Sequence, residues 1–228
     1  MNPFQYAKDL LFPRLCAACF ETLQVYENHI CIKCHLTLPQ ISGHDSEQIK
    51  LDKKFWGKIC VKNTYSFLHF TKNGPVQNIL HNLKYKNKPE LAEFMGAWFG
   101  NQLLTKHFNE EIDLILAVPL HPIKLKRRGY NQADHIANGL SVILNVPFEK
   151  EVIIRNRFTE TQTNKSRHNR FANMDGVFEI INEEKIRGKR VVLVDDVLTT
   201  GATLEVAGNE ILKGGCSELS ILTIAAAL

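Results

Sequence analysis

The sequence predicts an α/β fold, in which helices pack on a parallel sheet, with a small cysteine-rich module ahead of it. Short apolar runs alternate with segments of helical apolar spacing, which is typical of βαβ units. In addition, four of the six cysteines, Cys16, Cys19, Cys31 and Cys34, fall within the first 34 residues. The 228 residues are 44% hydrophobic and 23% charged, an ordinary globular composition that excludes wholesale disorder and collagen-like structure.

Predicted strands and helices alternate from about residue 59 onward. Apolar runs predict strands at 59–70, 114–118, 190–194 and 219–224, with weaker ones at 148–154 and 177–181. Helical spacing of apolar residues predicts helices within 76–83, 91–103, 133–144 and 204–212. The polar stretches 41–58 and 155–176 are expected to be a connector and a loop. We therefore expect three parts: a cysteine module (1–45), a basic connector with a strand (46–75) and a main domain (76–228).

The four early cysteines form two C-x-x-C pairs, Cys16 with Cys19 and Cys31 with Cys34, separated by eleven residues. Four thiolates are a ligand set that a tetrahedral zinc ion prefers, and a site closed by four protein ligands is usually structural. Disulfides or redox chemistry are the alternative. They are disfavoured because a redox C-x-x-C is expected near a βαβ unit, whereas this module is short and polar.

The strongest chemical signal lies in residues 191–203, which read VVLVDDVLTTGAT. Apolar residues predict a buried strand, Asp195 and Asp196 follow it, and a loop rich in threonine and glycine leads into a helix. Ligands of open α/β sheets bind beyond the carboxyl ends of strands, and a helix start offers free N–H groups to an anion. The carboxylates suit the hydroxyls of a sugar, and a phosphate suits the loop residues Thr199, Thr200, Gly201, Ala202 and Thr203. The segment therefore predicts a sugar-phosphate site.

This segment resembles the phosphoribosyl pyrophosphate (PRPP) motif of the type I phosphoribosyltransferases. The wider chain resembles the ComF (competence protein F) family in the cysteine pairs, in LKY (83–85), VPLHP (118–122) and RRGYNQ (127–132), and in residues 162–178. The resemblance implies a type I phosphoribosyltransferase fold with a zinc-ribbon-like module. It also implies that Asp195 and Asp196 hold the ribose hydroxyls while Thr199 to Thr203 cradle the 5-phosphate.

A second anion site is expected in residues 119–170, which carry ten Lys and Arg residues against four acids. In the family that the chain resembles, the loop after the strand at 114–118 grips pyrophosphate, which with Mg²⁺ needs a cationic pocket. The polar stretch 155–176 is long enough to be a lid. The candidates are Leu120 and His121 in the loop, Arg128 as a catalytic cation, and Lys165 and Arg167 in the lid. A solvated surface charge is the alternative for each lysine.

Residues 50–88 form another basic stretch, with nine lysines and a single acid, and Trp56, Tyr65 and Tyr85 are interleaved with them. Basic grooves with aromatic residues hold single-stranded nucleic acid, although a solvated face has the same composition.

Three functions fit these features. The first is PRPP-dependent transfer of the phosphoribosyl group to an unknown nitrogen acceptor, with a structural Zn²⁺ and with Mg²⁺ on PRPP. The second, implied by the ComF resemblance, is a protein that handles single-stranded DNA during DNA uptake in natural transformation, alongside a helicase. The third is a PRPP sensor without turnover. No apolar stretch reaches the roughly 18 residues of a membrane span, and no signal-peptide pattern is evident, so we expect a cytoplasmic protein.

Overall fold

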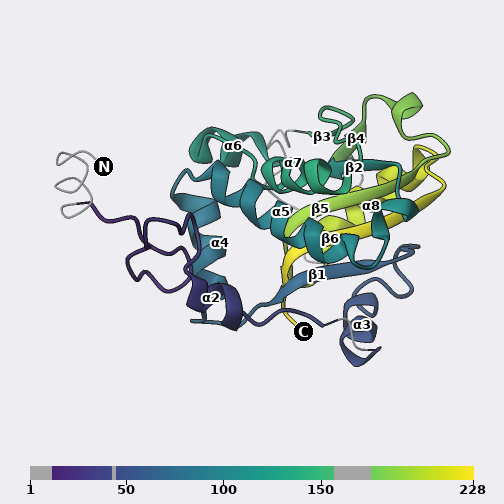
Figure 1. Cartoon of the computed structure of the whole chain (residues 1–228). Helices are drawn as coiled ribbons and strands as arrows, with labels where there is room; N and C mark the ends of the chain where they lie inside the picture. The colour runs from purple at the N-terminus through teal and green to yellow at the C-terminus, as the bar shows by residue number, and fades with distance from the viewer. Residues whose placement is uncertain (1–11, 43–44, 157–175) are drawn as a thin grey trace, which may run out of the picture.

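A computed structural model describes residues 12–42, 45–156 and 176–228, and its centre is a parallel four-stranded sheet (Figure 1). The strands are β1 (Thr64–His69), β2 (Leu114–Ala117), β5 (Arg190–Leu198) and β6 (Glu218–Ala226), in the order β1-β6-β5-β2. Two short strands, β3 (Ile153–Arg155) and β4 (Phe178–Ile180), form a separate antiparallel pair. The predicted α/β fold with a parallel sheet is confirmed.

The helices are α2 (Ile32–Thr37), α3 (Asp45–Asp52), α4 (Pro75–Tyr85), α5 (Pro89–Leu104), α6 (Pro122–Arg128), α7 (Gln132–Leu144) and α8 (Ala202–Lys213). Helical apolar spacing predicts α4, α5, α7 and α8. It misses α3, in which six of the eight residues are polar, and α6, which buries no side chain. No helix in the described ranges is both long and apolar enough to cross a membrane.

The strand register determines where Asp195 and Asp196 lie in the sheet. Ala117, the last residue of β2, pairs with Val194 of β5, and β5 continues beside β6 as far as Leu198. Asp195 and Asp196 therefore lie just beyond the end of β2. The expectation that the β5 strand ends at residue 194 is wrong, because pairing with β6 carries the strand through both acids.

Alternate residues of β5 face two different layers. Val192 and Val194 pack in a cluster with α4, α5 and α7, whereas Val191 and Leu193 pack in a second cluster with α8. A strand that is covered on both faces is apolar at consecutive positions. This explains the unbroken apolar run that precedes Asp195.

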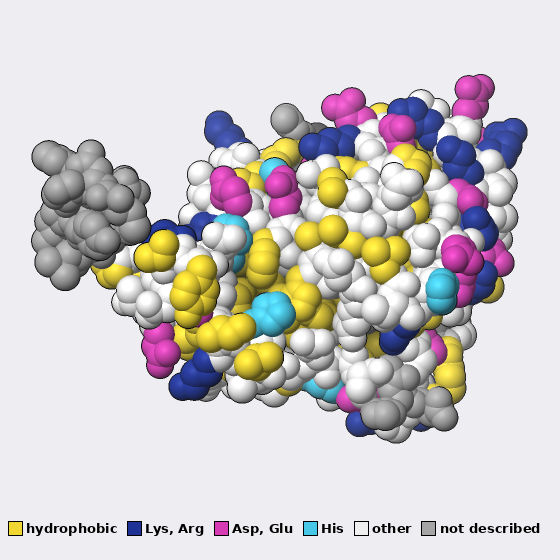
Figure 2. Space-filling view, in the orientation of Figure 1, with side chains coloured by type: hydrophobic (Ala, Val, Ile, Leu, Met, Phe, Trp, Pro, Cys, Tyr) yellow, Lys and Arg dark blue, Asp and Glu magenta, His cyan; other side chains and the backbone are white. Residues whose placement is uncertain are grey.

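The cysteine module, described here as residues 13–38, lies beside α4 and packs its cysteines into the same cluster as α4 and α5 (Figure 1). At its border the ring of His35 stacks on that of Trp98, with centroids 4.0 Å apart. Figure 2 shows hydrophobic side chains over the module and its surroundings, and the exposed ones include Val25, Tyr26 and Leu36. The module thus has one apolar side in the core and another on the surface. The division of the chain at residues 45 and 75 stays a prediction.

The backbones of helices α5 and α7 approach each other closely at two glycines. A Cβ atom added at Gly139 would lie 2.1 Å from the carbonyl oxygen of Glu93, and one at Gly96 would lie 2.2 Å from that of Ile136. No side chain fits between these backbones without separating the helices.

We therefore expect Gly139→Ala to destabilise the protein by about 1–3 kcal/mol, the usual effect of overpacking. In an isolated helix, replacing glycine by alanine would instead stabilise the helix by roughly 0.8–1 kcal/mol. The clash with the neighbouring backbone therefore determines that the substitution destabilises the protein. Urea unfolding measures the difference. The control is Asn138→Ala on the exposed side of α7, and a Gly139→Ala protein as stable as this control would contradict the close approach.

Candidate functional site

The two C-x-x-C pairs converge on one point. The sulfur atoms of Cys16, Cys19, Cys31 and Cys34 all lie within 4.8 Å of one another. The backbone N–H of Cys31 donates to Cys16 Sγ over 3.3 Å. Burial raises the pKa of the Cys16 thiol, but backbone N–H donors, Cys31 first, outweigh it and lower the pKa to about 7. Four clustered sulfurs with a thiolate near neutral pH fit a metal ion such as zinc.

The histidines next to the cysteines are engaged elsewhere. The ring of His29 packs against Phe94, with centroids 5.4 Å apart, while His35 stacks on Trp98. Neither is part of the sulfur cluster. The four cysteines are therefore the ligand set that the described structure brings together.

Asp195 and Asp196 lie at the carboxyl end of the sheet, where their carboxylates have different surroundings. Asp196 is buried and pairs with Lys84 at the end of α4, with 3.1 Å between Nζ and Oδ2. Asp195 accepts a hydrogen bond of 2.8 Å from the backbone N–H of Asp196. Burial and the charge of Asp196 raise the pKa of Asp195 to about 7, although Lys84 and Arg155 act in the opposite direction. The two acids thus share a site with cations from α4 and β3.

Arg155 is the second of these cations. Its side chain is half-buried at the end of β3, and burial lowers its pKa while the charge of Asp195 opposes that shift. Its guanidinium lies over the ring of Phe178, 5.2 Å from the centroid. Packing on an apolar ring leaves the charge of Arg155 available to an anion at the acid pair.

The predicted phosphate loop forms the turn from β5 into α8. Gly201 has a φ of 83°, a left-handed conformation that glycine adopts without strain, and it precedes the first residue of α8. Residues Thr199 to Leu204, with Asp195 and Val197, line a small cavity of about 50 Å³. The first residues of α8 line this cavity, and the start of a helix suits a phosphate.

The loop after β2 contains two of the predicted residues. His121 is the N-cap of α6, and its Nδ1 accepts a hydrogen bond from the N–H of Ile123 over 3.2 Å. Leu120 lines a cavity of about 270 Å³ together with Arg155, Asp134 and Lys150. Leu120 and Arg155 therefore line the same cavity, whereas the His121 ring supports the start of a helix.

Arg128 lies at the end of α6, against the end of α4. Its guanidinium donates to Gln132 Oε1 over 2.8 Å and lies over the ring of Tyr85, 5.7 Å from the centroid. Tyr130 donates its hydroxyl proton to the carbonyl of Leu83. The segments 83–85 and 128–132 are thus packed together, and their meeting place includes Lys84, the partner of Asp196. Lys165 and Arg167 lie outside the described residues.

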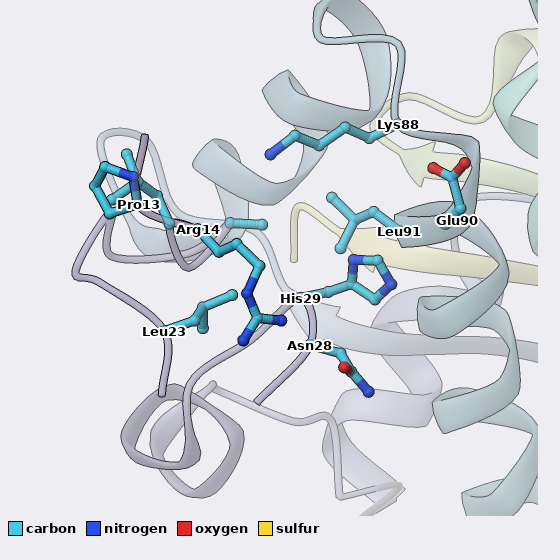
Figure 3. Close-up of a pocket in the computed structure, with 10 residues that line it drawn as sticks. Pro13, Arg14, Leu23, Asn28, His29, Lys88, Glu90 and Leu91 are labelled. Atoms are coloured by element: carbon cyan, nitrogen blue, oxygen red, sulfur yellow. The ribbon is translucent and has the colours of Figure 1, made fainter. Parts of the chain in front are cut away.

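A separate cavity of about 540 Å³ lies between the cysteine module and the start of α5 (Figure 3). Arg14, His29 and Lys88 are among the residues that line it. The guanidinium of Arg14 donates to backbone carbonyls within the module, including that of Glu27. Predicted site residues do not line this cavity, so it belongs to the border between the module and α5.

Comparison with known protein families matches residues 84–228 to the phosphoribosyl transferase domain. The chain belongs to this family. The acid pair and the turn after it lie within the matched region, and they are called the phosphoribosyl site after the name of that domain. Lys84 is the first residue of the matched region, so both partners of the ion pair fall within it.

Several curated proteins are similar to the chain. Competence protein F of Haemophilus influenzae is 26% identical over 222 residues, which cover 93% of this chain and 96% of that protein. Competence protein ComFC of Bacillus subtilis is 25% identical, covering 87% and 84%. DNA utilization protein YhgH of Escherichia coli K12 is 29% identical, covering 64% of this chain and 65% of that protein. The resemblance to the ComF family is confirmed.

Solved structures of other proteins are similar to a smaller part of the chain. A purine phosphoribosyltransferase from Pyrococcus horikoshii is 26% identical with a TM-score of 0.39, covering 58% of this chain and 75% of that one. A glutamine PRPP amidotransferase from Bacillus subtilis is 19% identical with a TM-score of 0.43, covering 63% and 30%.

Lys84 and Arg155 are the residues of the phosphoribosyl site that the sequence patterns did not single out. Each lies in a stretch that contributed to the expectations above, Lys84 in the LKY motif and Arg155 among the cations of residues 119–170. Their roles depend on packing between segments that are distant along the chain. The available signals were the position of Lys84 in a family motif and the membership of Arg155 in a cation-rich stretch.

The raised pKa of Asp195 predicts a pH dependence of stability. The unfolded chain loses this proton near pH 3.8, whereas the folded protein keeps it until about pH 7. Asp195 therefore stabilises the fold at low pH, and this contribution is lost as the pH rises through 7. We expect Asp195→Asn to raise the melting temperature at pH 8 by at least about 2–4 °C, the shift that 1 kcal/mol produces in a chain of this size.

Melting curves at pH 5 and pH 8 check this expectation, since the gain should shrink at pH 5. Asparagine can still accept the N–H of Asp196, so the hydrogen bond is retained. Glu184→Gln, at an exposed position before β5, removes the same charge as a control. A gain that is equal at both pH values would contradict the titration of Asp195.

Proposed function

We propose that this chain binds PRPP, or a related ribose 5-phosphate, with Mg²⁺ at the phosphoribosyl site, and that it acts in the cytoplasm in DNA uptake. One observation carries the proposal. The acid pair and the turn Thr199–Thr203 occupy one end of β5, and two cations from other elements act on the acids. The names of the relatives, competence protein and DNA utilization protein, support the biological setting.

Each group of the site has a separate role in this proposal. The carboxyl oxygens of Asp195 and Asp196 accept hydrogen bonds from the ribose hydroxyls. The N–H groups at the start of α8 and the hydroxyls of Thr199, Thr200 and Thr203 hold the 5-phosphate. Arg155 and Arg128 add positive charge on the side of β2 and α6, where the pyrophosphate would lie.

This placement supports a transfer of the phosphoribosyl group to an acceptor. The bond between C1 of the ribose and the pyrophosphate oxygen breaks, and its electron pair leaves with the pyrophosphate. A nitrogen of the acceptor bonds to C1 and gives up a proton to solvent. Mg²⁺ on the pyrophosphate supplies neutralising charge. The protein contributes orientation and charge stabilisation, which are large terms in such reactions.

The alternative function is binding of single-stranded DNA, with a helicase as partner. The ammonium of Lys53 lies over the exposed ring of Trp56, 5.8 Å from its centroid, an arrangement that suits a stacked base. Other lysines of residues 50–88 are paired with acids, Lys58 with Glu205 and Lys62 with Glu218. The phosphoribosyl site is therefore the better supported of the two.

Calorimetric titration of PRPP with Mg²⁺ tests the proposal. We expect Asp195→Asn and Asp196→Asn each to weaken PRPP binding by about tenfold or more, because a hydrogen bond to a charged group contributes roughly 1.5–3 kcal/mol. Release of pyrophosphate on adding a nucleobase or amine, but not without one, would establish turnover.

Glu184→Gln serves as the charge-matched control and should bind PRPP like the parent protein. Unchanged PRPP affinity in both acid variants would overturn the site. Binding of PRPP without pyrophosphate release over a panel of acceptors would indicate a PRPP sensor without turnover. Tight, steeply salt-dependent binding of a labelled single strand that is lost in Trp56→Ala would favour the alternative.

We also propose that the metal of the cysteine module is zinc, because sulfur ligands in two C-x-x-C pairs suit a tetrahedral ion. Protein purified under reducing conditions should contain one zinc per chain by atomic emission. We expect Cys31→Ser to lose zinc and to melt at a lower temperature, whereas Cys60→Ser, at an exposed cysteine outside the cluster, should keep both. Metal-free parent protein with an unchanged melting curve would contradict a structural zinc.

A further inference from the structure

Helix α4 is bonded to the cysteine module along one side. Asn78 Nδ2 donates to the carbonyl of Ala18 over 2.7 Å, and Asn82 Nδ2 donates to the carbonyl of Ala17 over 3.1 Å. Ala17 and Ala18 are the two residues between Cys16 and Cys19. The helix is thus held by the turn that presents the first pair of sulfurs.

Water cannot replace the carbonyl group to which Asn82 donates. Asn82 is 5% exposed, and its amide also donates to the carbonyl of Asn78. A buried donor that loses its acceptor destabilises the arrangement that buries it. The position of the Cys16–Cys19 turn therefore determines the position of the last turn of α4.

The same last turn of α4 reaches the phosphoribosyl site. Lys84, two residues after Asn82, pairs with Asp196. Leu83 between them is fully buried, and its carbonyl accepts the hydroxyl of Tyr130. One turn of α4 therefore contacts the cysteine module through Asn82 and contacts Asp196 through Lys84, two residues later.

We propose that Lys84 is a positioning residue of the phosphoribosyl site and that the cysteine module, through Asn82 and α4, holds it beside Asp196. The inference rests on the proposed function, since it concerns binding at that site. Lys84 offsets the charge of the buried carboxylate, which would otherwise repel the phosphates of an incoming ligand. Affinity for PRPP thereby depends on a module that has no contact with the acids in the described structure.

The first test measures PRPP–Mg²⁺ affinity in the full chain by calorimetry. Lys84→Met should bind PRPP about tenfold more weakly, and Lys84→Arg should recover part of the loss because it keeps the charge. Lys86→Met removes the same charge two residues further on, at an exposed position, and should change little. Equal losses in Lys84→Met and Lys86→Met would overturn the role of Lys84.

The second test is a double-mutant cycle between the module contact and the site contact. Asn82→Leu keeps the size of the side chain but cannot donate to Ala17, and we expect it to weaken PRPP binding several-fold. In a Lys84→Met background it should cause little further loss, because coupled residues are not additive. If the effect of Asn82 were purely structural, the fold-losses of PRPP affinity in the two single variants would multiply in the double variant. That result would overturn the proposal.

Melting curves show whether Asn82→Leu folds, and Asn78→Ala replaces it in the cycle if it does not. The acid variants separate this inference from the function on which it rests. If Asp195→Asn and Asp196→Asn leave PRPP affinity unchanged, the proposed function fails. If they abolish it while Asn82 and Lys84 act independently, only the coupling to the module fails.

Discussion

Asp195 and Asp196 repel one another at the end of β5, and the elements around them supply the compensating charge. Burial and the charge of Asp196 raise the pKa of Asp195 to about 7, so ionising both acids is costly for a domain whose total stability is roughly 5–15 kcal/mol. Lys84 pairs with Asp196, whereas the charges of Lys84 and Arg155 act on Asp195 without fully offsetting its burial. Helix α4 and strand β3 are therefore electrostatic partners of β5 as well as packing elements.

The phosphate turn has a different physical basis, since it needs no distant partner. In the proposed function its donors are backbone N–H groups and threonine hydroxyls of the same segment, and its shape follows from Gly201 at the start of α8. A Cβ atom at Gly201 would lie 3.1 Å from the ring of buried Phe55, so the residue is constrained by its neighbour as well as by its own conformation. The part of the site proposed to bind the 5-phosphate is thus built mainly by local geometry, and the part proposed to bind the ribose hydroxyls by long-range packing.

This difference explains how far the sequence predicts the site. The apolar strand, the acid pair, the turn and α8 are contiguous, so the pattern of residues 191–213 is sufficient to find them. Lys84 lies on another helix more than 100 residues before Asp195, and periodicity shows only that its helix has an apolar face. His121 caps the start of α6, and its role at the pyrophosphate stays a prediction. Helix α6 was missed for a related reason, since an exposed helix of seven residues leaves no periodic apolar pattern.

The distribution of charge also supports the proposed class of ligand over two simpler ones. A nucleobase alone would leave the carboxylates without donors and the start of α8 without an anion. A neutral sugar could satisfy the acids but would leave Arg155 and the α8 N–H groups unused. A phosphorylated ribose places hydroxyl donors and phosphate acceptors a few ångströms apart, in the same order as the acids and the turn along β5 and α8. The pairing of Lys84 with Asp196 strengthens this choice, because it reduces the negative charge that the second, pyrophosphate end of such a ligand has to approach.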